Sequence, residues 1–570
     1  MNVGIVGSGP ATDAVRAALG DAATVAETEA SDVGEVDLAL VADTAGAAAF
    51  SETNAVALAS ETPWLAVELG GLAGRGVCTA AVSGFAPGTA CYTCLCTRVE
   101  ANIEGTAGDP DEVDDATAWL AGARAGYEAR RLVEGEESAV LGGVVEIPHA
   151  ERRLLAVPNC ECEGEGSRGG ALDRNYEERD LDAALGRAER ALDRRTGIVR
   201  EVGEVASFPA PYYLARAGET AGFSEASAAS EAAGVAVGWD EALMKALGEA
   251  LERYSAGVYR DSSFVRGTPD EVENSVPPSS FVLPEEVDAD PDDSIPWVEG
   301  ERLSTGETVR LPAEFVTFPP PERRHGPSIT TGLGLGSSGA EALCSGLYEV
   351  IERDAAMVSW YSSFEPLGVA VDAEPFATLA ARARSEDLTV RAALITQDVD
   401  VPVVAVGVGR GEWPQLAVGS AADFDPEAAA GAALAEALQN WMELRAMGPE
   451  EADAAGGAVG RYAAEPGDAA AFFDVDGRIP AASAGPETVP AGEDELEMLL
   501  ERIEDAGLDA YAARLTPRDV ESLGFEAVRV LVPEAQPLFT DEPYFGERAR
   551  EVPEEMGFEA DLDHEFHPYP

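Results

Sequence analysis

At residues 245–253 the chain reads Lys-Ala-Leu-Gly-Glu-Ala-Leu-Glu-Arg, and at residues 345–354 it reads Ser-Gly-Leu-Tyr-Glu-Val-Ile-Glu-Arg-Asp. Both stretches contain Glu-x-x-Glu-Arg, formed by Glu249, Glu252 and Arg253 and again by Glu349, Glu352 and Arg353. Positions i and i+3 share one face of a helix, so each stretch is predicted to present two carboxylates side by side. The residues between them are apolar, which indicates half-buried helices. Buried carboxylate pairs are costly unless they bind a cation or a base. Two such helices facing each other would hold Mg²⁺ against nucleotide phosphates.

The overall charge is strongly negative. The 570 residues include 105 acidic and 39 basic side chains, for a net charge of −66, and Lys245 is the one lysine. The acidic residues run through the whole chain, which is typical of a cytoplasmic protein of a halophilic, salt-accumulating organism, where salt screens the self-repulsion. An acidic surface made for a basic partner is the alternative. The charge argues against a nucleic-acid substrate, because phosphate binding needs a basic footprint.

Nothing in the sequence predicts a membrane segment or an export signal. The apolar runs are too short to span a bilayer, and residues 1–9 predict a strand entering a turn rather than a signal peptide. Seven cysteines in a chain of this size do not indicate a disulfide scaffold. We therefore expect a cytoplasmic protein with no membrane partner.

The sequence predicts an α/β protein with two main domains. Residues 1–167 are assigned to a Rossmann-like domain that also carries a zinc knuckle. Residues 195–570 are assigned to a larger α+β domain. Residues 168–194 are assigned to a linker and a polar helix, the linker because Glu161–Asp173 is rich in Gly and Glu and the helix over Leu181–Arg194.

The first glycine-rich turn, Gly7-Ser8-Gly9, is only a weak indication of a nucleotide-binding site. Thr12 stands where a dinucleotide fingerprint has its third glycine. A structural strand–turn–helix is therefore favoured over a nucleotide site. Strands are also expected over Val36–Ala42 and Val401–Val408, a helix over Pro426–Arg445, and an irregular chain from Pro533 onward.

Two close cysteine pairs predict a structural zinc site. They are Cys91-x-x-Cys94 and Cys160-x-Cys162, interpreted as knuckles at opposite ends of one helical stretch. Zinc takes four thiolates at the corners of a tetrahedron, which leaves no open position for catalysis. The second spacing is unusually short, so Cys96 could replace one ligand. The alternative is that these cysteines are small buried hydrophobes.

From Thr196 to the C-terminus, about two-thirds of the chain resembles the YcaO family. The matching pieces occur in order: Ala246–Tyr254, Thr331–Gly336, Glu341 leading into Glu349–Asp354, Ala433–Gln439 and Arg529–Pro533. Any one piece is a weak signal, but together they are specific.

The resemblance implies a pocket that binds ATP and Mg²⁺ and activates a peptide amide by phosphorylating its oxygen. Carried over residue by residue, it implies that Mg²⁺ and phosphate are held by Glu249, Glu252, Glu349 and Glu352, with Glu436 and Gln439 alongside. It also implies that Arg253 or Arg353 offsets phosphate charge. The alternative is that these residues form ordinary i,i+4 surface pairs, such as Glu249 with Arg253. That alternative explains one helix but not two helices together with a third acidic one.

The N-terminal region resembles a second protein class. Gly88–Cys94 and Val157–Cys162 are similar to the zinc-bearing, ubiquitin-activating-enzyme-like partner of azole-forming cyclodehydratases. That partner presents a precursor peptide to a YcaO protein, and the resemblance implies that the two are fused here.

The last residues read Phe566-His567-Pro568-Tyr569-Pro570. Azoline-forming members of the YcaO family end in alternating prolines, and here Phe566 replaces the first of three. A proline-restricted tail loses little entropy when it is ordered. Pro568 and Pro570 are therefore assigned a catalytic role, in which the terminal carboxylate accepts protons. A frayed terminus is the alternative.

These observations lead to one interpretation and two alternatives. The interpretation is an ATP- and Mg²⁺-dependent cyclodehydratase that forms thiazoline or oxazoline rings from Cys, Ser or Thr of a peptide or protein substrate. The alternatives are a thioamide-forming enzyme that uses external sulfide and a non-catalytic peptide-binding scaffold. The tail and the fused N-terminal module weigh against thioamide formation. A flavin dehydrogenase partner and a homodimer are both compatible with the interpretation.

Overall fold

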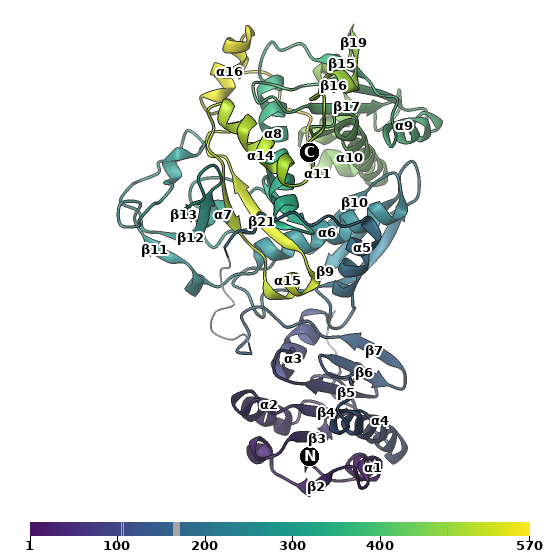
Figure 1. The fold of residues 1–570 in the computed structure, drawn as a ribbon. Helices are drawn as coiled ribbons and strands as arrows, with labels where there is room; N and C mark the ends of the chain where they lie inside the picture. Colours follow the sequence, from purple (N-terminus) through teal and green to yellow (C-terminus); the bar gives the residue numbers. More distant parts are fainter. Residues whose placement is uncertain (104, 106–107, 163–170, 456, 476) are drawn as a thin grey trace.

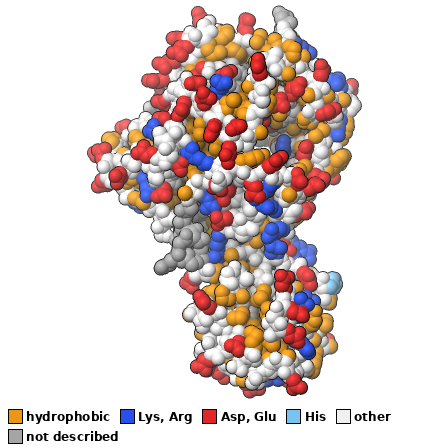
Figure 2. Space-filling model, viewed as in Figure 1, with side chains coloured by type: hydrophobic (Ala, Val, Ile, Leu, Met, Phe, Trp, Pro, Cys, Tyr) orange, Lys and Arg blue, Asp and Glu red, His pale blue; other side chains and the backbone are white. Residues whose placement is uncertain are grey.

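The computed structural model describes residues 1–103, 105, 108–162, 171–455, 457–475 and 477–570. The chain forms a smaller N-terminal lobe, purple to blue in Figure 1, and a larger lobe built from the rest. The predicted linker from Glu161 to Asp173 falls mostly on residues 163–170, which lie outside the described residues, as does the predicted boundary at residue 167. Acidic side chains are spread over the visible face of both lobes (Figure 2).

The N-terminal lobe is a sheet covered by helices on both faces. Its described strands run in the order β2-β1-β3-β4-β5-β6-β7, with β1 to β4 parallel and β5 to β7 antiparallel. The strands are β1 (Asn2–Val6), β2 (Thr24–Glu27), β3 (Leu38–Thr44), β4 (Trp64–Leu69), β5 (Ala80–Phe85), β6 (Gly143–Ile147) and β7 (Ala150–Arg153). The helices are α1 (Pro10–Leu19), α2 (Ala48–Ser60), α3 (Tyr92–Ala101) and α4 (Asp115–Val133). A 3-10 turn covers Ala30–Glu35. This arrangement confirms the predicted Rossmann-like start.

Alternation along β3 explains why both faces are covered. Leu38 and Leu40 face the core under α1 and α4, whereas Ala39 and Val41 face the core under α2 and α3. Helices α1 and α4 approach closely because α4 has a glycine at the crossing. A Cβ atom on Gly122 would lie 2.1 Å from the Ala11 carbonyl oxygen, so only glycine fits there.

The larger lobe contains three further sheets among the described residues. Their strand orders are β10-β9-β8, β11-β12-β20-β21-β14 with β13 beside β12, and β18-β17-β16-β15-β19. The strands are β8 (Val199–Ala206), β9 (Tyr212–Ala217), β10 (Glu231–Val235), β11 (Val265–Gly267), β12 (Ile295–Arg302), β13 (Glu307–Pro312), β14 (Leu333–Gly336), β15 (Leu367–Ala370), β16 (Thr389–Leu394), β17 (Val403–Gly409), β18 (Ala417–Ala422), β19 (Arg478–Pro480), β20 (Tyr511–Arg514) and β21 (Glu526–Leu531).

Long helices follow several of these strands. The helices are α5 (Leu181–Ala188), α6 (Trp239–Gly257), α7 (Ala313–Val316), α8 (Gly339–Trp360), α9 (Phe376–Ser385), α10 (Pro426–Met447), α11 (Pro449–Ala455), α12 (Ala458–Ala464), α13 (Gly467–Phe472), α14 (Glu493–Asp505), α15 (Arg518–Leu523) and α16 (Arg548–Met556). Short 3-10 turns cover Glu189–Ala191, Asp261–Ser263, Pro278–Ser280 and Ala481–Ser483. Among the described helices, none combines the length and the apolar composition that a bilayer crossing requires.

One strand–helix unit occurs three times in the larger lobe, as β10–α6, β14–α8 and β18–α10. In each unit a glycine of the strand lies against the backbone of the helix that follows. A Cβ atom on Gly234, Gly334 or Gly419 would lie 2.2, 2.2 or 2.5 Å from a helix carbonyl oxygen. The glycines therefore permit a close strand–helix packing that any larger residue would push apart.

Four expectations about local structure need correction. The helix predicted over Leu181–Arg194 ends at Ala188 and continues as a 3-10 turn to Ala191. It does not reach Arg194, because Asp193 accepts hydrogen bonds from the amides of Arg195 and Thr196 and forms a turn. The strand predicted from Val401 begins at Val403, since Pro402 lacks the amide hydrogen that a ladder requires. The strand predicted over residues 36–42 lies two residues later, and the C-terminal region contains α16 rather than only irregular chain.

Candidate functional site

The three strand–helix units each fix one glutamate with a backbone amide. The amides of Ala233, Gly332 and Ser420 donate to Glu249, Glu349 and Glu436 at 2.7, 3.0 and 2.7 Å, respectively. Each bond joins the strand side of a unit to its helix. The three carboxylates are therefore oriented by the same kind of hydrogen bond from a backbone amide. Glu436 of α10 is held in the same way as Glu249 and Glu349 of the two predicted pairs.

The second glutamate of each predicted pair is buried more deeply. Burial raises the pKa of Glu252 to about 8, and repulsion from Glu349 adds to the increase. Burial likewise raises the pKa of Glu352 to about 8, with Glu436 adding and Arg353 opposing. Ser420 Oγ donates to Glu352 at 2.6 Å. Carboxyl groups held together with raised pKa values favour a bound cation, which relieves their repulsion.

Two predicted arginines lie among these carboxylates. Arg253 Nη2 lies 2.9 Å from Glu249, so the i,i+4 pair considered from the sequence is present. Arg353 belongs to α8, and its side chain extends toward α10, with Nε 3.7 Å from Glu352 and Nη2 3.8 Å from Glu436. These contacts join the helices around one centre rather than stabilising a solvated surface.

Arg529 of β21 is a site residue that the sequence reasoning missed. Its side chain is buried, and Nη2 donates to the Ile329 carbonyl at 3.0 Å. Within the described residues, its Nε and Nη1 have no hydrogen-bond partner. Burial lowers the pKa of Arg529 to about 10, whereas Glu349 and Glu252 oppose this shift. Buried guanidinium donors aimed at a polar site fit an anion such as phosphate.

Lys245 is the second residue without a role assigned from the sequence. It lines a cavity of about 460 Å³ together with Glu249 and Glu252. This volume is in the range of small-ligand sites. The signal for Lys245 was present in the sequence, because the one lysine among 570 residues lies four positions before Glu249 on the first glutamate helix.

Within the described residues, Gln439 donates no hydrogen bond to Glu249, Glu252, Glu349, Glu352 or Glu436, the five glutamates of the carboxylate centre. Its Nε2 donates to Glu443 at 3.1 Å, and Glu443 also accepts from Tyr212 at 2.9 Å. Gln439 thus contacts a neighbouring carboxylate on its own helix.

The four predicted cysteines converge in the N-terminal lobe. Their sulfur atoms lie within 4.8 Å of one another, with Cys91–Cys94, Cys91–Cys160 and Cys94–Cys162 at 3.8, 3.6 and 3.5 Å. Four bonds of about 2.3 Å from a central zinc ion place sulfurs about 3.8 Å apart, so the arrangement fits a tetrathiolate site.

The two cysteine pairs are not at the ends of one helix, as the sequence suggested. Cys91 and Cys94 begin α3, whereas Cys160 and Cys162 follow β7, with α4 and β6 in between. Cys96 is not part of the group and lies near Tyr92 and Glu68.

The C-terminal tail is packed rather than frayed. His567 and Tyr569 are 1% and 2% exposed. Tyr462 donates to the Phe566 carbonyl at 2.6 Å, and His567 Nε2 lies 2.7 Å from the Phe539 carbonyl oxygen. The tail ends with the Pro570 oxygen 3.5 Å from Arg353 Nη1. Residues up to Pro570 therefore reach the edge of the carboxylate centre.

A sequence profile described as YcaO cyclodehydratase, ATP- and Mg²⁺-binding, matches residues 233–536, more than half of the chain. The chain belongs to the YcaO family. It is an ATP-dependent cyclodehydratase of the YcaO type. The matched region begins within β10 and contains all three glutamate-bearing helices, α6, α8 and α10.

The chain is also similar to one curated protein and to several solved structures. An uncharacterized protein of Methanothermobacter thermautotrophicus is 28% identical over 355 residues, covering 57% of this chain and 87% of that protein. Two solved structures share the fold over 98% of this chain. One is a heterocyclase in complex with substrate and cofactor, with a TM-score of 0.75, 19% identity and 83% of that chain covered. The other is the heterocyclase TruD, with a TM-score of 0.69, 18% identity and 82% of that chain covered.

A third structure is YcaO from Methanopyrus kandleri bound with AMPPCP and Mg²⁺. It has a TM-score of 0.50 and 24% identity, and the match covers 65% of this chain and 98% of that chain. The two heterocyclases therefore share the fold of both lobes, whereas the match to the YcaO of Methanopyrus kandleri covers a smaller part of the present chain.

Metal analysis of the purified protein should find about one zinc ion per chain, the content of one closed tetrathiolate site. A Cys160→Ser variant should lose this zinc and destabilise the N-terminal lobe, because one corner of the tetrahedron is removed. Cys344→Ser is the matched control, since Cys344 is buried in α8 far along the chain from the four cysteines. Zinc retained by the Cys160→Ser variant would contradict the assignment.

Binding of Mg²⁺ and nucleotide to this YcaO protein should release protons between about pH 5 and 8. The pKa values of Glu252 and Glu352 are raised to about 8, so both groups hold protons in this range without a cation. A cation binds the ionised carboxylates, so the apparent Mg²⁺ affinity should increase as the pH rises toward 8. Calorimetry in buffers of different ionisation enthalpy measures the protons released. A pH-independent affinity in this window would show that the carboxyls do not face the cation.

Proposed function

We propose that the chain forms thiazoline or oxazoline rings from Cys, Ser or Thr residues of a peptide or protein substrate. The observation that carries this proposal is the packed tail, which ends against Arg353, the arginine that lies beside Glu352 and Glu436. Two of the structures with the same fold are heterocyclases, one of them in complex with substrate and cofactor, and the YcaO of Methanopyrus kandleri holds AMPPCP and Mg²⁺.

The glutamates and the cationic side chains suit different parts of a magnesium nucleotide. Carboxylate oxygens are the ligands that Mg²⁺ prefers, and we assign this role to Glu249, Glu252, Glu349, Glu352 and Glu436. Guanidinium and ammonium groups suit phosphate oxygens, and we assign this role to Arg253, Arg353, Arg529 and Lys245. Gln439 would support α10 through Glu443.

ATP supplies the phosphoryl group that turns the amide oxygen into a leaving group. In the overall reaction the side-chain sulfur or oxygen bonds to the preceding carbonyl carbon, and the carbonyl oxygen leaves with the phosphoryl group as phosphate. The side chain and the amide nitrogen each lose a proton. We assign proton acceptance to the carboxylate of Pro570, with Pro568 restricting the tail.

The two lobes would have different roles in the reaction. In this proposal residues 1–167 hold the peptide and carry the structural zinc, residues 168–194 connect the lobes, and residues 195–570 activate the amide. An azoline can be oxidised to an azole only with an oxidant, so a flavin dehydrogenase is the partner that we propose for any later oxidation.

Incubation with ATP, Mg²⁺ and Cys-containing peptides, in high salt, tests the function. We expect ATP hydrolysis that increases with the peptide, and a product lighter by one water for each ring. A heavier product in the presence of sulfide, with oxygen exchanged for sulfur, would instead establish thioamide formation. Peptide binding without ATP hydrolysis would support a scaffold.

A further inference from the structure

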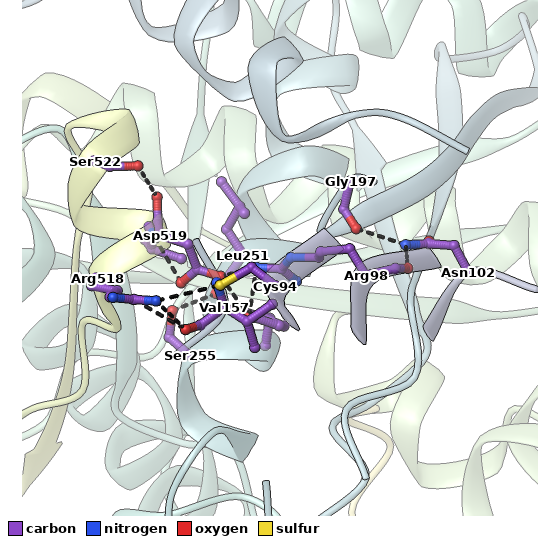
Figure 3. A network of polar contacts seen from close by, with 12 residues as sticks. Cys94, Arg98, Asn102, Val157, Gly197, Leu251, Ser255, Arg518, Asp519 and Ser522 are labelled. Carbon is purple, nitrogen blue, oxygen red and sulfur yellow. Dashed lines mark hydrogen bonds and ion pairs between the residues drawn. The ribbon is translucent and has the colours of Figure 1, made fainter. Parts of the chain in front are cut away.

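Two consecutive residues of the larger lobe reach into the N-terminal lobe beside the cysteine group. Arg518 begins α15, and its Nη2 lies 3.7 Å from Cys94 Sγ (Figure 3). The same nitrogen lies 3.1 Å from Cys162 Sγ. The same guanidinium donates from Nε and Nη2 to the Val157 carbonyl at 3.0 and 2.7 Å. One side chain of the larger lobe therefore contacts both cysteine pairs and the loop that carries the second pair.

The next residue, Asp519, contacts both the cysteine-bearing helix and the first glutamate helix. The Asp519 carboxylate is fully buried and accepts a hydrogen bond from Tyr254 of α6 at 2.6 Å. It also forms an ion pair with Arg98 of α3. Tyr254 lies two positions beyond Glu252, and Arg98 lies one helical turn beyond Cys94. Asp519 therefore joins the metal-site helix to the helix that carries two proposed Mg²⁺ ligands.

The surroundings of this ion pair leave it little freedom. The Arg98 side chain is 2% exposed, and its guanidinium lies over the rings of Phe223 and Tyr254, at 5.5 and 5.7 Å from their centroids. At the C-terminal cap of α3, Asn102 donates to the Gly197 carbonyl at 3.0 Å, so a second bond ties this helix to the chain that enters β8 (Figure 3). Cys94, Leu247 and Val520 belong to one continuous apolar core. Helices α3 and α15 are thus both in contact with α6 through packed, charged groups.

We propose that metal binding at the cysteine group and nucleotide binding at the glutamate helices are energetically coupled, with Arg518 and Asp519 as the positioning residues that connect them. This inference rests on the proposed function. A bound ion fixes four sulfurs in one tetrahedron and thereby fixes the acceptors around Arg518. Loss of the ion removes that constraint from the loop at Val157 and from the start of α15. The position of Asp519, and with it Tyr254 and Glu252, is then less strictly defined.

Coupling between two binding sites is reciprocal, which makes the inference testable without peptide turnover. In the wild-type protein, saturating Mg²⁺ and AMPPNP should raise the zinc affinity, measured as zinc release to a competing colorimetric chelator at equilibrium, by about tenfold, within the usual range of such couplings. Zinc-depleted protein should bind AMPPNP more weakly by a similar factor. Both measurements use the full chain in high salt.

Variants locate the coupling in the connecting residues. Arg518→Gln loses a donor to Cys162 Sγ, so zinc should bind more weakly in every condition. The effect of nucleotide on zinc release should nevertheless mostly disappear, whereas Arg518→Lys should restore part of it by retaining the charge. Arg502→Gln is the matched control, because Arg502 of α14 pairs with Asp400, away from both sites. It should behave as the wild type.

The outcomes separate this inference from the function on which it rests. If the wild type binds AMPPNP but zinc release does not respond, the coupling is wrong and the proposed function stands. If Arg518→Gln shows the full wild-type response, the assignment of Arg518 is wrong. A wild type that binds no magnesium nucleotide would overturn the proposed function and the coupling together.

Discussion

The Glu252→Gln variant is expected to lose ATP hydrolysis while its fold becomes more stable near neutral pH. Glutamine keeps the shape of the side chain but cannot supply a charged oxygen to Mg²⁺. Even indirect partners of metal ligands cost about 10–100-fold when they are replaced, so loss of a ligand itself should reduce hydrolysis by more than about 100-fold.

The gain in stability follows from the direction of the pKa shift. Burial, followed by repulsion from Glu349, raises the pKa of Glu252 from an ordinary 4.5 to about 8. Between these values the folded state binds more protons than the unfolded state, so the wild-type fold loses stability as the pH rises through this window. Each pKa unit corresponds to about 1.4 kcal/mol. Because glutamine cannot ionise, the stability of the variant does not fall with pH for this reason.

Thermal unfolding without nucleotide should therefore give a higher Tm for Glu252→Gln at pH 7.5 and nearly equal values at pH 4.5. Asp240→Asn is the control on the same helix, because Asp240 is exposed in the first turn of α6. It should change neither hydrolysis nor the pH dependence. Wild-type hydrolysis by Glu252→Gln would remove this residue from the site, and a lower Tm at pH 7.5 would contradict the electrostatic argument.

The sequence predicted the parts of the site that depend on short-range spacing. The i,i+3 glutamates follow from helical geometry alone, and the two cysteine pairs are recognisable because zinc needs four thiolates. The threefold use of one strand–helix unit was harder to see. The strand amide and the glutamate are 16, 17 and 16 residues apart in the three units. The insertions between the units destroy any fixed period, so only the fold reveals the repeat.

Residues that reach the site from distant segments left no local signal. Arg529 lies in a strand whose alternation looks purely structural, and its two unpaired nitrogens matter only because β21 lies beside α6 and α8. Arg518 and Asp519 lie more than 350 positions from the second cysteine pair and from α3 in the chain. Their roles depend on tertiary packing that spacing along the sequence does not encode.

Local errors also have physical causes. The helix expected to Arg194 stops early because Asp193 offers its own carboxylate to nearby amides, which competes with the helix. Helix α16 was not expected because Pro553 stands inside it. The buried ion pair between Arg548 and Asp354 anchors that helix to α8, so a tertiary contact outweighs a poor local sequence.

Removal of residues 567–570 is expected to stop ring formation while magnesium-nucleotide binding persists. The deleted segment holds three buried residues and the oxygen that lies 3.5 Å from Arg353. The glutamates keep their own bonds to strand amides without it. Loss of a general base should slow ring formation by about 10²–10⁴-fold. Mass spectrometry of the peptide and calorimetry with AMPPNP measure the two properties separately.

A one-residue extension distinguishes the proposed carboxylate from simple packing. Adding a glycine after Pro570 keeps His567 and Tyr569 available for their buried positions but moves the carboxylate by up to about 3.6 Å. If the Pro570 carboxylate accepts protons, the extended protein should be nearly as slow as the truncated one. Glu565→Gln is the control, because Glu565 precedes the buried segment and its side chain is 57% exposed. An extended protein that forms rings at the wild-type rate would show that the tail only fills space, because the group placed beside Arg353 would then have no part in proton transfer.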